Sequence, residues 1–132
     1  MSNAEQAFPE IQIQCKDRYR SFCLNLGAFR AIEEHMQRVT ENPKFSVLKD
    51  YDWNQDTISH AILMVWAGMW TDARKSGETW TLEDAEDVVS IMSMDQVQYC
   101  VSESLKRVLT PEQFAELGGK KKAMTKPRMR AA

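Results

Sequence analysis

The longest apolar stretch of the chain, AILMVWAGMW, runs from Ala61 to Trp70 without a charged residue. Crossing a bilayer takes about 20 mostly apolar residues, and a run half that long is typical of a buried core helix. Asp56 before the run and Asp72 after it prevent its extension in either direction. The stretch therefore predicts the central helix of a folded domain rather than a membrane span.

A helix through this stretch would be apolar on nearly every side. The expected core stripe comprises Ile58, Ile62, Val65 and Met69. A second stripe, about a quarter turn around the helix, comprises Leu63, Trp66 and Trp70. The edge best suited to water comprises His60, Met64 and Thr71. Such a helix must be covered on most of its circumference.

The cover of the Trp66–Trp70 side has two explanations at this point. The favoured one is that the rest of the chain covers it, because a run apolar on all sides is normally the central helix of a domain. The other is that a partner protein covers it, since tryptophans are favoured as interface anchors. The candidate partner-binding residues are Leu63, Trp66, Trp70 and Trp80.

Length and composition are consistent with one folded unit. The chain has 132 residues, 43% of them hydrophobic, which fits a single domain with its own core. We expect a flexible lead-in over residues 1–9, a globular domain over 10–119 and a separate tail over 120–132. The first residues lack the basic start and apolar segment of a signal peptide, and three cysteines are an odd count, so we expect free thiols in a reducing, cytoplasmic compartment.

Charge is distributed unevenly along the chain. The last 13 residues carry six basic side chains and no acidic one, which leaves 11 basic against 19 acidic residues elsewhere and a body charge near −8. Basic clusters can bind phosphates. This tail has no aromatic residue to stack on bases, and the acidic body would repel a nucleic acid, so we favour a disordered solubilising or docking tail.

Periodicity predicts a mainly helical α+β fold. Alternation over residues 10–14 and 19–25, with a polar break at 16–18, predicts an N-terminal β-hairpin. Asn25 is a candidate N-cap for a helix whose apolar stripe comprises Leu26, Phe29, Ile32 and Met36. A polar connector over 40–56 follows, in which Phe45, Val47 and Leu48 are expected to pack down. The helix with the apolar run then ends at residues 75–77.

Three further helix starts carry capping signals. The stretches TLED (81–84), SMDQ (93–96) and TPEQ (110–113) each place Ser or Thr three residues before an acid or Gln. The helix after Ser93 is expected to turn Val97, Val101, Leu105 and Val108 inward. The last helix is short, carries Phe114 and Leu117, and is expected to end at Gly118-Gly119. The sum is a hairpin followed by four to five helices around a central apolar helix.

Catalytic and cofactor signatures are missing from the sequence. There is no phosphate-binding glycine loop, no nucleophile elbow and no metal-ligand spacing. A metal held by Cys15, Cys23 and His35 is conceivable, but buried structural thiols explain these cysteines better. The acidic group in residues 83–87 fits a solvated helix start, where acids favour the helix dipole. We therefore expect no enzyme activity and no cofactor.

Three ordered motifs carry a resemblance to a known family. They are LNLGAFRAIEE (24–34) directly after the hairpin, ILMVWAGMW (62–70), and WTLEDAEDVV (80–89). Their order and spacing resemble the tail assembly chaperones of long-tailed phages and prophages, over about residues 11–95. Trp80 stands where that pattern has leucine, the segment 40–56 is long for it, and the basic tail is not part of it.

The resemblance implies a non-enzymatic role in tail morphogenesis. Such chaperones coat the tape measure protein before the tail tube polymerises around it, keep its helices soluble and recruit tail tube subunits. They act in the host cell cytoplasm and are absent from the mature virion. The expected partners are thus the tape measure protein and the tail tube protein, with self-association left open. No family catalytic residues exist to carry over.

Two other functions compete with this one. A structural tail or head–tail joining protein would remain in the virion. A small nucleic-acid-binding regulator would rest on the basic tail alone.

Overall fold

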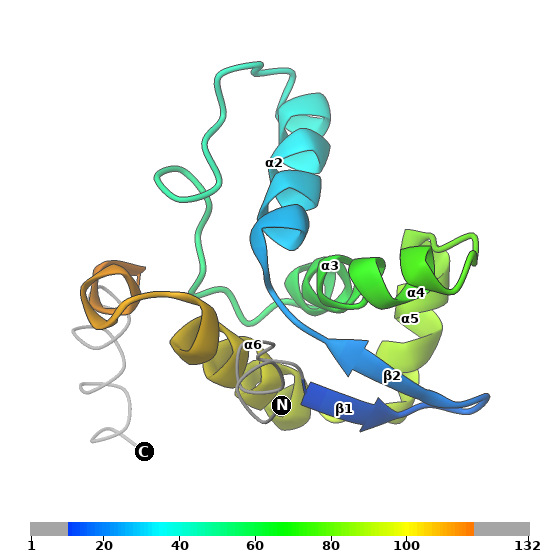
Figure 1. Cartoon of the computed structure of the whole chain (residues 1–132). Helices are drawn as coiled ribbons and strands as arrows, with labels where there is room; N and C mark the ends of the chain where they lie inside the picture. The colour runs from blue at the N-terminus through cyan, green and yellow to red at the C-terminus, as the bar shows by residue number, and fades with distance from the viewer. Residues whose placement is uncertain (1–10, 118–132) are drawn as a thin grey trace.

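The alternation near the N-terminus is confirmed as a β-hairpin in the computed structural model, which describes residues 11–117 (Figure 1). Strand β1 (Ile11–Gln14) pairs antiparallel with β2 (Tyr19–Phe22), with Ile11 opposite Phe22. Phe22 is fully buried, and so is Leu24 just beyond the strand. The hairpin is therefore fixed to the core at the end of β2.

Five helices follow the hairpin between residues 26 and 108. They are α2 (Leu26–Thr40), α3 (Ile58–Gly68), α4 (Trp70–Lys75), α5 (Leu82–Ile91) and α6 (Met94–Val108). The chain is helical again over residues 111–117. The predicted α+β, mainly helical class is confirmed. The flexible lead-in, the basic tail and the helix end at Gly118-Gly119 lie outside the described residues.

The capping signals are confirmed at four helix starts. The Asn25 side chain accepts a hydrogen bond from the Ala28 amide. The starts of α5, of α6 and of the helical residues 111–117 are reciprocal capping boxes, in which each side chain bonds the other residue's backbone N–H. These boxes pair Thr81 with Asp84, Ser93 with Gln96, and Thr110 with Gln113. Because caps satisfy N–H groups that have no partner inside the helix, local sequence defines these starts.

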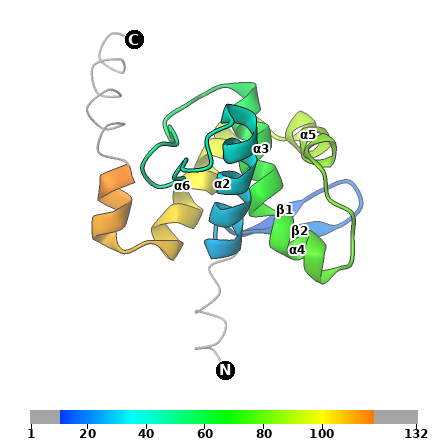
Figure 2. The same cartoon turned by 90° about the horizontal axis from the view of Figure 1, so that it is seen from above.

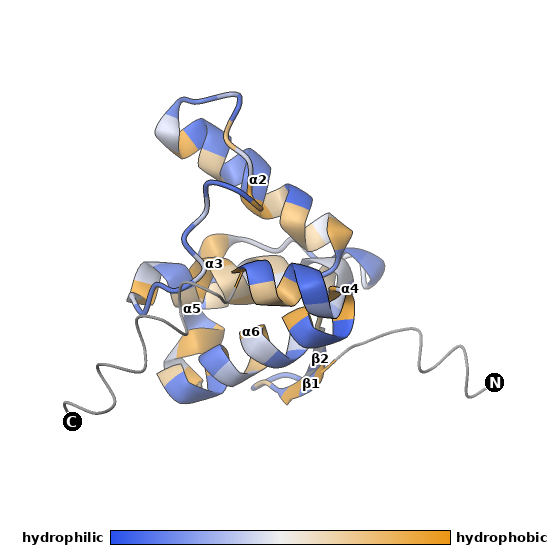
Figure 3. Cartoon of the chain, turned by 90° about the vertical axis from the view of Figure 1, so that its left-hand side faces the viewer, coloured by the Kyte–Doolittle hydropathy of each residue, from blue (hydrophilic) through white to orange (hydrophobic). Residues whose placement is uncertain are grey.

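Helix α3 occupies the middle of the fold, as predicted. It packs against α2, α4, α5, α6 and β2 (Figure 2). Met64 and Val65 are fully buried, and Ala61 and Ala67 let neighbouring helices approach closely. Orange, hydrophobic segments lie on α3 and also on α2 and α5 (Figure 3). None of the helices described here is both long and apolar enough to cross a membrane.

The single helix expected up to residue 75 is wrong, because the chain breaks at Met69 between α3 and α4. The Phe22 ring packs so closely on Gly68 that a Cβ there would lie 2.2 Å from it. The Gly68 carbonyl accepts a hydrogen bond from the Cys23 amide at 2.9 Å. That carbonyl therefore joins the hairpin to the end of α3.

The apolar stripe predicted for α2 is confirmed at Phe29 and Ile32 and wrong at Leu26, and Met36 is half-buried against the core. Leu26 is 81% exposed, and the buried positions are Ala28, Phe29, Ala31 and Ile32. The error has a local cause, since Leu26 lies in the first turn, directly after the cap. On α6 the inward positions Val97, Val101 and Leu105 are confirmed. Ser104 is also fully buried there, and its hydroxyl accepts a hydrogen bond from the Leu24 amide at 2.7 Å.

The connector between α2 and α3 contributes more to the core than predicted. Val47 is buried, whereas Leu48 is exposed. Tyr51 and Trp53 are buried as well, and their rings meet edge to face at 5.1 Å. The Trp53 ring also contacts Phe29 at 5.7 Å, and its indole N–H donates to the Val47 carbonyl. This aromatic cluster fastens the connector to the base of α2.

Candidate protein-binding surface

Helices α3 and α4 have one partly exposed apolar edge. Its residues are four positions apart, one turn of helix at a time: Ile58, Ile62, Trp66 and Trp70. Ile58 is 67% exposed, and the other three are half-buried. Helix α2 rises away from α3 (Figure 1), and the exposure of these four side chains shows that the edge is covered only in part. We call these four residues the apolar edge.

The edge predicted to face water is wrong at two of its three residues. His60 and Met64 are buried, and only Thr71 is half-exposed. Helices α5 and α6 pack on that side of α3, and the Tyr51 ring stacks on His60. The core stripe is confirmed at Val65 and Met69 and wrong at Ile58. The rotation of α3 is therefore set by its neighbours, and two residues expected in the core lie on the apolar edge.

The four candidate partner-binding residues separate into two groups. Leu63 is buried in the core, and Trp80 is held by contacts within the chain. Trp66 and Trp70 are half-buried on the apolar edge. Trp80 is half-buried too, but Trp66 and Trp70 are the two candidates that lie on the apolar edge.

Trp80 is part of a structural clamp between the hairpin and the loop before α5. Its indole N–H donates to the Trp66 carbonyl at 2.9 Å, and the Arg20 guanidinium lies 4.7 Å from its ring centre. Arg20 forms ion pairs with Glu78 at 2.6 Å and with Asp17 at 2.9 Å. The hydrogen bond from Arg20 is the main cause that lowers the pKa of Glu78. Trp80 therefore serves the fold at the position where the family pattern has leucine.

A second arginine extends the same clamp to α4. Arg18 forms ion pairs with Asp72 at 3.3 Å and with Glu78 at 3.0 Å. Asp72 also accepts a hydrogen bond from the Ser21 amide. Opposite charges thus neutralise each other on this side of the molecule.

The tryptophan end of the apolar edge borders a surface hollow of about 480 Å³. Trp66 and Trp70 form one wall, and the small residues Gly27 and Ala31 of α2 form another. Its charged rim comprises Arg30, Glu34, Arg38 and Arg74. We call it the tryptophan hollow. Two indoles beside small residues leave room for an inserted apolar side chain.

The isoleucine end of the apolar edge borders a second hollow, also of about 480 Å³. Its apolar residues include Met36 and Val39 of α2, Ile62 of α3 and Leu82 of α5. Glu83 and Glu86 of α5 supply acidic groups. We call it the isoleucine hollow. Between the two hollows the His35 ring lies 6.0 Å from the Trp66 ring, so the same two helices border both.

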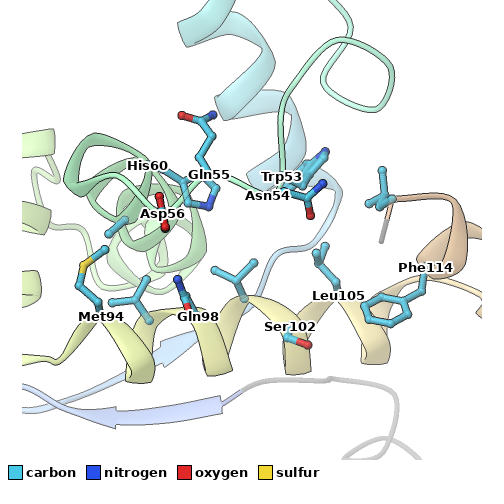
Figure 4. Close-up of a pocket in the computed structure, with 14 residues that line it drawn as sticks. Trp53, Asn54, Gln55, Asp56, His60, Met94, Gln98, Ser102, Leu105 and Phe114 are labelled. Carbon is cyan, nitrogen blue, oxygen red and sulfur yellow. The ribbon is translucent and has the colours of Figure 1, made fainter. Parts of the chain in front are cut away.

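A smaller cavity of about 70 Å³ lies between α6, residues 53–56 and the helical residues 111–117 (Figure 4). Phe114 and Leu117 close it from the side of the last helix, opposite Trp53 and Leu105. His60 also lines it and shares a 2.6 Å hydrogen bond with the Tyr51 hydroxyl. Burial is the main cause that raises the pKa of Tyr51. A neutral, buried phenol bonded to a histidine in so small a space is suited to packing.

Reactive groups are scarce in the part of the chain that the structure describes. All three cysteines are buried and none forms a disulfide, and burial raises the pKa of Cys15 and Cys100. Raised thiol pKa values disfavour the nucleophilic thiolate. No group of three His, Cys, Asp or Glu residues within 11–117 could hold a metal ion, the proposed Cys15, Cys23 and His35 set included. What this surface offers is apolar area and charge for protein contacts.

Comparison with known proteins finds no match for this chain among protein-family models, curated proteins or solved structures.

Proposed function

We propose that this chain is a tail assembly chaperone of a long-tailed phage or prophage. In this role it binds the tape measure protein and recruits tail tube subunits in the host cell cytoplasm, and it is absent from the mature virion. The three motifs that resemble the family correspond to α2, to α3 with α4, and to α5. These are the elements that surround the apolar edge, and this edge is the observation that carries the proposal.

The apolar edge has the chemistry expected of a client-binding surface. Surface hydrophobic residues are common singly, whereas a row of four with two tryptophans is typical of a contact site. Tryptophan side chains bury large areas and dominate the energetics of many interfaces. The two hollows beside the edge add concave apolar walls from α2 and α5.

A long helical client fits this surface physically. Tape measure helices that wait for the tail tube would leave apolar side chains in water, which favours aggregation. An amphipathic client helix could lay its apolar residues along the edge, in the manner of helix-in-groove recognition. Covering both apolar surfaces at once stabilises the complex without any chemical step.

Co-expression with the tape measure protein of the same phage tests the proposal. We expect the unaltered chain to co-purify with the tape measure protein and to raise its soluble yield. The double variant Trp66→Ala/Trp70→Ala should lose most of this effect. Tyr99→Ala is the matched control, because Tyr99 is an exposed aromatic residue on α6, outside both hollows. Failure of the unaltered chain to co-purify would contradict the proposal.

Purified virions distinguish the proposed chaperone from a structural tail or head–tail joining protein. Mass spectrometry of the particles should detect the tail tube protein and the tape measure protein but not this chain. A stoichiometric amount of the chain in the particles would favour the structural role instead.

A further inference from the structure

Two arginines beside the tryptophans are not neutralised. Among residues 11–117, Arg38 and Arg74 form no ion pair with a carboxylate. The other described arginines all form one, namely Arg18, Arg20, Arg30 and Arg107. Both Arg38 and Arg74 line the tryptophan hollow, and the Arg74 guanidinium lies 5.0 Å from the centre of the Trp70 ring. The hollow therefore holds positive charge that the fold leaves available.

The charge balance of the hollow is opposite to that of the body. Within it, Glu34 is paired with Arg30 at 3.1 Å, so these two charges cancel. Arg38 and Arg74 remain, on a chain whose net charge is −2 and whose acidic side chains outnumber the basic ones outside the tail. Complementary charge on a partner steers its approach and selects its orientation. The complement of two exposed guanidiniums is a pair of carboxylates.

The apolar walls of the hollow favour a partner with an apolar side chain between those carboxylates. Trp66 and Trp70 are half-buried, and Gly27 and Ala31 leave space opposite them. Tryptophan and arginine together are the residue types most enriched at the energetic centres of interfaces. An extended nucleic acid is a poorer fit, because its phosphates continue beyond two guanidiniums and would meet a chain body in which acidic side chains outnumber basic ones.

We propose that the tryptophan hollow binds an acidic amphipathic helix of the partner. A bulky apolar side chain of that helix packs against Trp66 and Trp70, and its flanking carboxylates pair with Arg38 and Arg74. This inference rests on the proposed function, since it specifies the chemistry of the client segment that the apolar edge accepts. It also sets the direction of the client, because the isoleucine hollow at the other end of the edge carries Glu83 and Glu86.

Three labelled helical peptides of about 20 residues, long enough to hold a helix in water, test the charge requirement. Each has the same leucine and phenylalanine face, and the remaining positions carry Glu, Gln or Lys. Fluorescence anisotropy at low and high salt gives the affinity of the full chain for each peptide. We expect the Glu peptide to bind at least about tenfold more tightly than the Gln and Lys peptides, and to weaken as salt rises.

Charge-reversed variants locate the binding. Arg38→Glu/Arg74→Glu should weaken the Glu peptide at least about tenfold and improve the Lys peptide. Lys44→Glu/Lys49→Glu is the matched control, since it makes the same change in net charge at residues outside the hollow. Equal binding of the three peptides, no peptide binding, or equal effects of the two double variants would overturn the inference. Stronger binding of a labelled single-stranded DNA than of the Glu peptide would overturn it too.

The same variants separate this inference from the proposed function. If the tape measure protein co-purifies and depends on Trp66 and Trp70 but not on Arg38 and Arg74, the chaperone function stands and the acidic client is wrong. If the Glu peptide binds as described and the tape measure protein does not co-purify, the acidic site stands and the function is wrong.

Discussion

Two arginine–tryptophan pairs on this molecule have the same chemistry and opposite surroundings. Arg20 lies over Trp80 at 4.7 Å, and Arg74 lies over Trp70 at 5.0 Å. Arg20 is only 7% exposed and pairs with two carboxylates, whereas Arg74 is exposed and has no ion pair among the described residues. The first pair lies in the clamp of the hairpin, and the second lies at the rim of the tryptophan hollow.

Both places contain an arginine over a tryptophan, so residue type does not distinguish them. What separates the structural contact from the candidate binding site is whether the charged groups have partners within the chain. In the clamp every charge has a partner and the indole N–H donates to the Trp66 carbonyl, so these polar groups are satisfied within the chain. In the hollow the indoles are half-buried and two guanidiniums lack a carboxylate. Substitutions should therefore affect stability at the clamp and partner binding at the hollow.

The largest difference in stability is expected between substitutions at two glycines, Gly68 beside the hairpin and Gly27 in the tryptophan hollow. Gly68→Ala would place a methyl group 2.2 Å from the buried Phe22 ring, and it should lower the free energy of unfolding by about 3 kcal/mol. At Gly27 the nearest atom to an added methyl group is Asn25 Oδ1 at 3.5 Å, so Gly27→Ala should leave stability unchanged or raise it by up to about 1 kcal/mol. Urea unfolding followed by circular dichroism measures both. Equal losses would mean that the hairpin side is not the tightly packed one.

Removal of Arg20 should mainly lower the stability of the fold, whereas removal of Arg74 should mainly weaken partner binding. Arg20→Ala should cost about 2 kcal/mol of unfolding free energy, less than for a fully buried pair because the Glu78 side chain is 30% exposed. Arg74→Ala should change stability by less than about 0.5 kcal/mol, as surface substitutions generally do. Thermal unfolding and peptide anisotropy on the same samples give both quantities. A stability loss at Arg74 as large as at Arg20 would contradict the distinction.

The clamp should also make stability sensitive to acid. The hydrogen bond and charge of Arg20 lower the pKa of Glu78 in the folded state from 4.5, so the folded state favours the carboxylate. This contribution is present above that ordinary value and is lost as pH falls through the folded pKa. Glu78→Gln should therefore flatten the decline of stability between about pH 5 and 3. An unchanged slope would remove Glu78 from the clamp.

The smallest expected effect concerns His35, which borders the apolar edge. Partial burial and the charge of Arg38 lower the pKa of its imidazole in the folded state. Arg38→Ala should therefore raise this pKa, whereas Arg74→Ala should change it less. An NMR titration of the imidazole signals measures the shift. A pKa that stays constant in Arg38→Ala would show that burial alone sets it.

Local signals in the sequence predicted the elements well. The caps at Asn25, Thr81 and Ser93 depend on residues three positions apart, and each is confirmed. The hairpin and the central position of α3 follow from apolar periodicity, which is also local. These features need no knowledge of what packs against them.

Features that depend on contacts between distant segments could not be predicted in the same way. The break at Met69 arises because Phe22 packs on Gly68, and no periodicity contains that contact. When a helix is apolar on all sides, its sequence does not indicate which face points to the core. The predictions that His60 faces water and Ile58 faces the core are wrong for this reason. A glycine inside the apolar run was the one available signal for the break.

The candidate site was predicted only in part for the same reason. Of the four residues predicted to bind a partner, Trp66 and Trp70 are half-buried on the apolar edge, Leu63 is core and Trp80 belongs to the clamp. The arginines of the hollow were assigned no role, because Arg38 and Arg74 come from different helices and meet only in the fold. The aromatic cluster of Tyr51 and Trp53 could have been predicted. Two large rings on either side of Asp52 indicate a buried turn, even within a mainly polar connector.

Hydrogen exchange on the purified complex with the tape measure protein tests the central claim most directly. If the apolar edge and its hollows bind the client, amides of α2 and of residues 58–75 should exchange more slowly in the complex than in the free chain. Amides of β1 and of α6 around Tyr99 should exchange at unchanged rates. Protection of β1 and α6 with none along the apolar edge would contradict the account.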